Sequence, residues 1–263
     1  MSGLQPLLNL SLAAGLLGLD ATAAFQTMAS RPLVAGAVAG WLLGDAPSGL
    51  ALGAVLELCW IGALPVGSLV PPDGTAAAIF APAVLGALKS QGLPWPAAAA
   101  IGILAGLLLA FSGGKAEVLQ RRLADGVDRW VEARLLEGHE GSLSLGLLAG
   151  LALALGRGAL VMALALSLVL PMIVSATGRL DAGLVEGFSI CFWLLLMYGL
   201  AAAADHFWER RSLRYALGAA LLAVALAYVT RAPAWILLGL LGLYALACGA
   251  LRYRIETAPK ATA

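Results

Sequence analysis

The chain has 263 residues, of which 61% are hydrophobic and only 12% are charged, and its mean hydropathy is +0.93. A soluble domain of average composition carries about 25% charged residues, so this composition excludes an ordinary soluble enzyme and a disordered chain. The net charge is only +1. Because proteins that bind nucleic acids typically carry an excess of basic residues, we expect no nucleic-acid partner. The 32 glycines are scattered through apolar runs, a pattern that fits close packing of helices in lipid.

The positions of the charged residues predict a polytopic all-α membrane protein. Charges cluster within 112–142, 205–214 and 252–263, and long apolar stretches separate these clusters. A helix of about 20 apolar residues crosses the hydrocarbon core of a bilayer. The Lys and Arg residues of the three clusters place them on the cytoplasmic side.

Residues 1–111 are predicted to form a membrane domain with broken or re-entrant helices, in which 90–111 is the one full span. The shorter apolar runs, each interrupted by a charge, a proline or a glycine cluster, fall at 4–19, 32–44, 46–56, 58–72 and 74–88. Irregular backbone at membrane depth must be buried in protein or line a cavity. Short, interrupted apolar segments therefore point to the substrate site of a transporter.

Residues 112–142 are predicted to be a cytoplasmic amphipathic segment. Apolar residues recur at helical spacing over 115–135, at Leu119, Leu123, Val127, Trp130 and Val131. Such a helix suits the membrane surface, a partner or the protein's own bundle.

Residues 143–251 are predicted to form about four C-terminal membrane helices, and 252–263 a cytoplasmic tail. The helices are expected near 143–176, 187–204, 215–229 and 233–251. The first of these stretches is too long for one straight pass. We expect 156–158, a Gly-Arg-Gly sequence, or Pro171 to break or tilt it.

Glu57 lies inside the apolar run 49–66 and is the leading candidate for a substrate-binding residue. A carboxylate at membrane depth is costly unless it is paired, solvated or protonated, and such residues commonly mark substrate pathways. The alternative is a structural charge paired with another helix, for instance with Arg31. Trp60 is the tryptophan nearest to Glu57, and it could stack on a sugar face or anchor the chain at the membrane interface.

Asp73 lies in a Pro-Pro-Asp-Gly sequence, which predicts a turn followed by a helix over 75–88 that Asp73 caps. The simpler interpretation is a surface turn. The alternative is a re-entrant tip whose carboxylate faces a polar cavity. Asp45 is expected to be a turn and cap residue in the same way.

Asp20 ends the first apolar run and opens a polar stretch with Thr22, Gln26, Thr27 and Ser30. Carboxylate, amide and hydroxyl groups together suit a sugar, because each sugar hydroxyl both donates and accepts hydrogen bonds. Asp20 and Gln26 are therefore candidate substrate-binding residues. The alternative is an ordinary loop in water.

No catalytic motif is found in the chain. It has no HExxH sequence, no nucleotide-binding glycine loop and no Gly-x-Ser-x-Gly sequence. We therefore expect no catalytic residue, no metal site and no cofactor.

An ordered series of short motifs resembles the IIC membrane subunit of the mannose/fructose/sorbose family of the bacterial phosphoenolpyruvate-dependent sugar phosphotransferase system. The resemblance covers roughly residues 15–80. The motifs are Arg31-Pro32-Leu33, Leu43-Gly44-Asp45, Leu56-Glu57 and Pro72-Asp73.

The resemblance implies a multi-pass subunit of the bacterial inner membrane that works with a IID membrane subunit, in a larger oligomer. Such a pair carries a hexose-type sugar to the IIB subunit, which phosphorylates it with phosphate passed on by IIA, so that IIC is non-catalytic by itself. The resemblance assigns sugar binding to Glu57 and Asp73, and less directly to Asp20 and Gln26, because the spacing before Arg31 varies.

One departure from the family pattern keeps other functions open. Members commonly read Met-Asn-Ile-Gly where this chain reads Leu64-Pro65-Val66-Gly67, so the ligand contacts there must differ. The sugar could be another one, or the chain could be a non-transporting membrane scaffold for phosphotransferase signalling proteins. A cation-coupled small-molecule carrier, with Glu57 as the proton site, is a further alternative.

Overall fold

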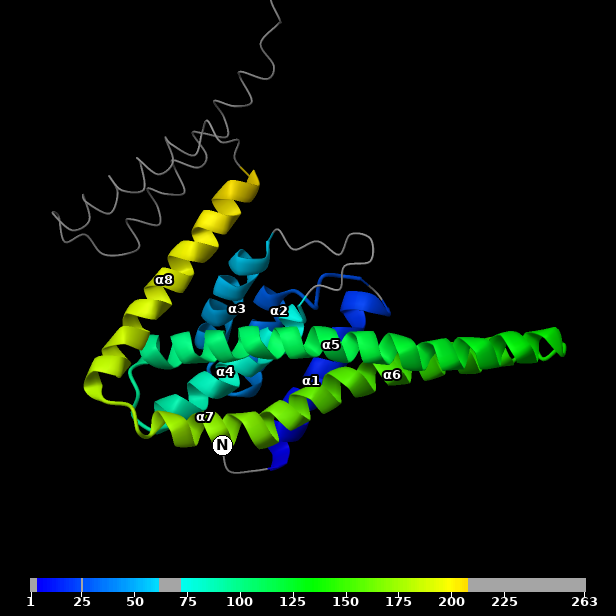
Figure 1. Ribbon diagram of the computed structural model, residues 1–263, viewed down its shortest axis with the longest axis horizontal. Coiled ribbons are helices and arrows are strands. Elements are labelled where there is room, and N and C mark those ends of the chain that lie inside the picture. The colour runs from blue at the N-terminus through cyan, green and yellow to red at the C-terminus, as the bar shows by residue number, and fades with distance from the viewer. Residues whose placement is uncertain (1–3, 25, 62–71, 208–263) are drawn as a thin grey trace, which may run out of the picture. The chain divides into compact units, whose positions relative to one another are not determined.

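The computed structural model describes residues 4–24, 26–61 and 72–207, and over these ranges the chain is helical and contains no strand. The all-α prediction is confirmed (Figure 1). The helices are α1 (Leu4–Thr22), α2 (Pro32–Leu42), α3 (Ala46–Trp60), α4 (Gly74–Ser90), α5 (Trp95–Leu136), α6 (Ser142–Leu164), the π-helical turn η1 (Ala165–Val169), α7 (Leu170–Thr177) and α8 (Ala182–Phe207). The predicted spans at 215–229 and 233–251 and the tail at 252–263 lie outside the described residues.

Four stretches of the described chain are long and apolar enough to cross a membrane. They are Leu4–Ala21, Trp95–Leu136, Ser142–Thr177 and Ala182–Ala203. The helices α2, α3 and α4 are apolar but shorter. The first run, 4–19, was expected to be a broken segment, but α1 is an unbroken helix of 19 residues. It passes Asp20 and ends at Thr22, and the loop that follows donates hydrogen bonds to the Asp20 carboxylate.

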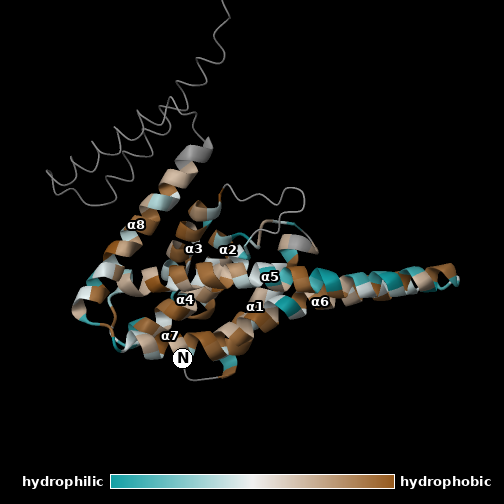
Figure 2. Cartoon of the chain, viewed as in Figure 1, coloured by the Kyte–Doolittle hydropathy of each residue, from teal (hydrophilic) through white to brown (hydrophobic). Residues whose placement is uncertain are grey.

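A single helix, α5, contains most of the predicted span at 90–111 and most of the amphipathic segment that follows. It runs without interruption for 42 residues from Trp95 to Leu136. Figure 2 shows that polar residues concentrate in its second half. The Gly113-Gly114 pair does not end the helix. Gly113 instead allows a close approach, because a Cβ there would lie 2.6 Å from the Cβ of Asp73.

The long stretch 142–177 deviates from a regular helix at Ala165–Val169, where the π-helical turn η1 precedes Pro171. Proline lacks the amide hydrogen that a regular helix needs, so irregular geometry next to it is expected. The prediction of an irregularity near Pro171 is confirmed. The prediction of a break at 156–158 is wrong, because α6 passes through these residues and Arg157 is buried against other helices.

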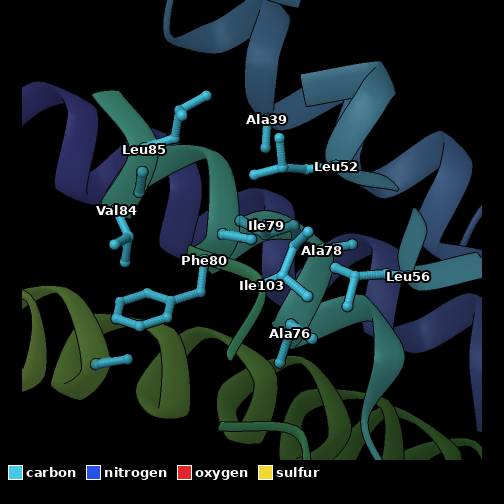
Figure 3. Packing of buried hydrophobic residues seen from close by; sticks show 14 of the residues in the cluster. Ala39, Leu52, Leu56, Ala76, Ala78, Ile79, Phe80, Val84, Leu85 and Ile103 are labelled. Carbon is cyan, nitrogen blue, oxygen red and sulfur yellow. The ribbon is translucent and has the colours of Figure 1, made fainter. Parts of the chain in front are cut away.

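The helix α4 is the centre of the described bundle. Buried side chains lie on all its sides, and Phe80 has no exposed surface. Figure 3 shows Ile79 of α4 beside Leu52 and Leu56 of α3 and Ile103 of α5. α4 begins directly after Asp73, one of the candidate substrate-binding residues, so this residue is attached to the most buried helix of the described chain.

Two short helices, α2 and α3, form an antiparallel pair whose backbones meet at glycines. A Cβ on Gly36 would lie 2.8 Å from the Cα of Gly53, and a Cβ on Gly40 would lie 2.7 Å from the Cα of Gly49. Small residues at these positions let the helices approach more closely than larger side chains would. The glycine-rich composition is therefore used here for direct backbone packing.

The turn between α2 and α3 is held by Asp45, as predicted. Its carboxylate accepts a hydrogen bond from the backbone N–H of Ser48 at 3.3 Å and caps α3. The Nζ of Lys89 lies 2.8 Å from the other carboxylate oxygen. The hydrogen bond from Lys89 holds the pKa of Asp45 below its ordinary value, against the opposing effect of desolvation.

Replacing Asp45 with alanine is expected to lower the stability of the detergent-purified protein by about 1 kcal/mol, the usual effect of losing a helix cap. Lys89→Gln keeps the cap and should have a smaller effect, because the pair is partly exposed to solvent. The folded-state pKa is lowered, so the stabilisation is present above the ordinary aspartate pKa and is lost as pH falls through the lowered value. Thermal unfolding of the variants at neutral and acidic pH measures this. Equal melting temperatures at neutral pH would contradict it.

Candidate functional site

The candidate site is centred on a loop, residues 26–31, that follows α1 and contacts the first turn of α4. Asp20 holds this loop through four hydrogen bonds. One oxygen accepts from the backbone N of Thr27 at 2.6 Å and from its Oγ1 at 2.7 Å. The other accepts from the backbone N of Ser30 at 3.0 Å and from its Oγ at 3.1 Å. Asp20 is only 6% exposed, so it is a buried carboxylate that closes the loop, whereas residues 26–28 of the loop itself are exposed.

The loop is joined to α4 by Thr75. The Oγ1 of this threonine donates to the backbone carbonyl oxygen of Ser30 at 2.7 Å. Thr75 is buried and lies in the first turn of α4. The hydrogen bonds of Asp20 therefore continue into the helix that Asp73 begins.

Asp73 caps α4, as predicted, by accepting a hydrogen bond from the backbone N of Ala76 at 3.0 Å. Its own backbone N–H donates to the carbonyl oxygen of Ala110 in α5 at 2.9 Å. The interpretation of Asp73 as a surface turn is wrong, because its side chain is only 12% exposed. Other helices cover it, and one of them supplies a counter-charge.

That counter-charge is Arg157 of α6. Its Nη1 lies 2.9 Å from Oδ2 of Asp73, and its Nε donates to Oε1 of Gln120 in α5 at 2.9 Å. The Arg157 side chain is only 7% exposed. Sequence reasoning missed this role and treated Arg157 as part of a helix break, although a lone cation in a long apolar run was a signal that a carboxylate partner was needed.

Glu57 is paired with Arg31, the structural alternative considered from the sequence. The Nη1 of Arg31 lies 3.3 Å from Oε1 of Glu57, and the backbone N of Leu33 donates to Oε2 at 3.3 Å. The Glu57 side chain is 22% exposed. An ionised carboxylate has about four acceptor sites, so Glu57 retains capacity to accept from a ligand. Since Arg31 directly follows Ser30, this pair adjoins the same loop.

Trp60 is the last residue of α3, and its side chain lies beside Gly74, the first residue of α4. Its ring is 3.3 Å from the position that a Cβ on Gly74 would occupy. Gln26 differs from the other candidates, because it is exposed and makes no side-chain hydrogen bond with the described residues. Its backbone adopts φ of 52°, a left-handed conformation that is uncommon outside glycine and asparagine.

The arrangement is suited to binding a polar, uncharged ligand. Carboxylates and hydroxyls occur together within an apolar helix bundle, next to an aromatic ring, and such a combination can meet both the donors and the acceptors of a polyhydroxy compound. Among the described residues, no group of three His, Cys, Asp or Glu side chains could hold a metal ion.

Comparison with known proteins gives a consistent result. Residues 5–247 match the family described as the PTS system sorbose-specific IIC component. A PTS system sorbose-specific EIIC component from Klebsiella pneumoniae is 37% identical over 99 residues, which is 38% of this chain. The match spans about a third, 34%, of that relative's length.

Two solved structures share the fold. One, described as a membrane protein, superimposes with a TM-score of 0.68 at 20% identity and covers 99% of this chain and 98% of its own. The other is the mannose transporter ManYZ in complex with microcin E492. It has a TM-score of 0.54 at 20% identity and covers 97% of this chain and 96% of its own. At these identities, the two structures establish similarity of fold.

Proposed function

Since the chain belongs to the sorbose-specific IIC family and is a multi-pass membrane component of a sugar phosphotransferase system, we propose that it binds a hexose-type sugar and translocates it across the bacterial inner membrane. In this proposal it works with a IID membrane subunit, in an oligomer. It presents the sugar to IIB, which carries phosphate received from IIA. The chain itself supplies the binding site and the path, and the phosphocarriers supply the chemistry.

The observation that carries the proposal is the meeting of Asp20, Glu57, Asp73 and Trp60 around one loop and the first turn of α4. Asp20 and Asp73 are buried and their oxygens are occupied, so they fix the geometry of the loop. Glu57 is partly exposed and has acceptor capacity left. We therefore assign direct contact with sugar hydroxyls to Glu57 and the framework role to the two aspartates.

The charge of Glu57 strengthens the assigned contact. A hydrogen bond from a hydroxyl to a carboxylate is roughly twice as strong as one between neutral groups. Phosphorylation on the cytoplasmic side would then add negative charge to the sugar, and a charged product does not return through hydrocarbon. Transport by this route is therefore irreversible and does not require an ion gradient.

Uptake of radiolabelled sorbose and mannose tests the proposal, in cells that carry this chain with its IID and IIB partners. Glu57→Gln preserves the shape of the side chain and an acceptor for the backbone N–H of Leu33 but removes the charge. We expect uptake to fall about tenfold or more, the effect of losing one charge-assisted hydrogen bond. Glu186→Gln is the matched control, because Glu186 is exposed on α8, and its uptake should equal that of the unmodified protein.

Two results would contradict the proposal. Unchanged uptake by Glu57→Gln at equal membrane abundance would remove Glu57 from the site. Uptake that survives deletion of IIB and collapses with an uncoupler would identify a cation-coupled carrier instead.

A further inference from the structure

Arg157 is a buried cation to which the proposed sugar contacts assign no role. It lies in α6, and its guanidinium reaches three other helices. It contacts Asp73 at the start of α4 and Gln120 in α5. Its Nη2 is 3.9 Å from the position that a Cβ on Gly18 of α1 would occupy. A charge in this position is tolerated because a carboxylate neutralises it and hydrogen bonds satisfy it.

The contacts of Arg157 leave Asp73 little freedom to rotate. One carboxylate oxygen of Asp73 accepts from Ala76 N in the cap of α4, and the other accepts from Arg157. Gln120 in turn holds the guanidinium through Nε. Gly113 of α5 also approaches so closely that any side chain there would collide with Asp73. Each partner of the ion pair is therefore fixed by a further contact.

The orientation of Asp73 matters for the rest of the site. Asp73 sets where α4 begins, and the first turn of α4 carries Thr75, which binds the carbonyl of Ser30. Ser30 is held from the other side by Asp20 and precedes Arg31, the partner of Glu57. A displacement of Asp73 would therefore reach Glu57 through a continuous chain of contacts.

We propose that Arg157 is a positioning residue for sugar binding, which acts through the Asp73 carboxylate and does not itself contact the sugar. The inference rests on the proposed function and adds α6 to the elements that shape the site. It requires the contribution of Arg157 to depend on the presence of the Asp73 carboxylate.

A double-mutant cycle on uptake kinetics tests this dependence. Labelled sorbose and mannose are the probes, and KM and Vmax are measured per transporter in the membrane for Arg157→Gln, Asp73→Asn and the double variant. Arg157→Gln should raise KM about tenfold, and Asp73→Asn should raise it similarly. The double variant should be no worse than Asp73→Asn alone, because neither group acts without the other. Arg157→Lys, which keeps the charge, should recover part of the loss.

Arg134→Gln is the matched control. Arg134 pairs with Glu137 at the end of α5 at 3.3 Å, and their side chains are 45% and 58% exposed, so its removal should leave KM unchanged. If Arg157→Gln fails to reach the membrane, the double variant decides, since replacing both partners of a buried pair is better tolerated than replacing one. Its KM should then equal that of Asp73→Asn.

Three outcomes would overturn the inference. Additive increases in KM would mean that Arg157 acts independently of Asp73. A reduced amount of Arg157→Gln protein with unchanged KM would mean a purely structural role. Absence of uptake by the unmodified chain would overturn the proposed function and this inference with it. Uptake by the unmodified chain, together with independent effects of the Arg157 and Asp73 substitutions on KM, would overturn the inference alone.

Discussion

Replacing Gly49 with alanine is expected to prevent the correct packing of α2 against α3 and to remove most of the folded protein. A Cβ on Gly49 would lie 2.6 Å from the Cα and 2.8 Å from the backbone N of Gly40, and closer still to the carbonyl oxygen of Gly36. These are backbone atoms, and no rotamer change can move them. The two helices must separate to admit the methyl group.

The expected cost is large because α3 contributes buried side chains to the core. Leu52 and Leu56 of α3 are fully buried. Loss of the contacts of a buried leucine costs about 2–5 kcal/mol. Loss of the contacts of both would cost about 4–10 kcal/mol, which is comparable to the lower part of the stability range of a typical domain, about 5–15 kcal/mol. Size-exclusion chromatography in detergent measures the result as loss of the monodisperse peak.

Gly86→Ala in α4 is the control for the chemical change alone. A Cβ at this position meets no heavy atom within 4 Å, and alanine favours a helix over glycine by about 1 kcal/mol. This variant should be as abundant as the unmodified protein, with an equal or higher melting temperature. Equal peaks for Gly49→Ala and Gly86→Ala would contradict the close packing of α2 and α3.

The helical nature of the elements could be predicted because lipid imposes a simple rule. Backbone groups must be satisfied within each segment, so long apolar stretches become helices. The caps at Asp45 and Asp73 could also be predicted, since a cap depends on residues two or three positions away. These features are local in the sequence.

Helix continuity could not be predicted in the same way. The change from apolar to charged residues near 112 suggested a boundary, but α5 continues through it, because a helix is held by its backbone and not by the polarity of its side chains. Likewise, the glycines beside Arg157 suggested a break, whereas they lie in a regular helix that closely approaches α1 at Gly158. Which glycine breaks a helix and which one packs depends on neighbours that are distant in sequence.

The two ion pairs of the site also differ in whether they could be predicted from the sequence. The pair of Glu57 with Arg31 could be anticipated, because Arg31 is the one basic residue before Lys89. The pair of Asp73 with Arg157 joins residues 84 positions apart. No pattern in a single sequence selects that partner, since it follows from how α6 packs beside α4 and α5.

Replacing Asp20 with alanine is expected to release the loop at 26–31 and to abolish uptake. The carboxylate accepts four hydrogen bonds, two from Thr27 and two from Ser30. Each donor left unsatisfied in a partly buried position costs about 1–3 kcal/mol. The loss should therefore reach several kcal/mol and appear as a large fall in melting temperature, together with uptake near background.

Asp181→Ala is the matched control for this loss. Asp181 also binds a backbone N–H, that of Leu184 at 2.8 Å, but it is exposed and has this one side-chain hydrogen bond with the described residues. The Asp181→Ala substitution should lower the free energy of unfolding by about 1 kcal/mol and leave uptake unchanged. Asp20→Asn is expected to lie between the two, because an amide retains one acceptor oxygen and so keeps about half of the contacts.

The two measurements together separate a framework role of Asp20 from direct contact with the sugar. A framework residue loses stability and uptake in parallel, since both depend on the closed loop. A fall in uptake with an unchanged melting temperature would mean that the loop is held without Asp20 and that its carboxylate binds the sugar itself. That result would leave Thr75, which donates to the carbonyl oxygen of Ser30, as the contact that holds the loop, and would move the substrate site from Glu57 toward the end of α1.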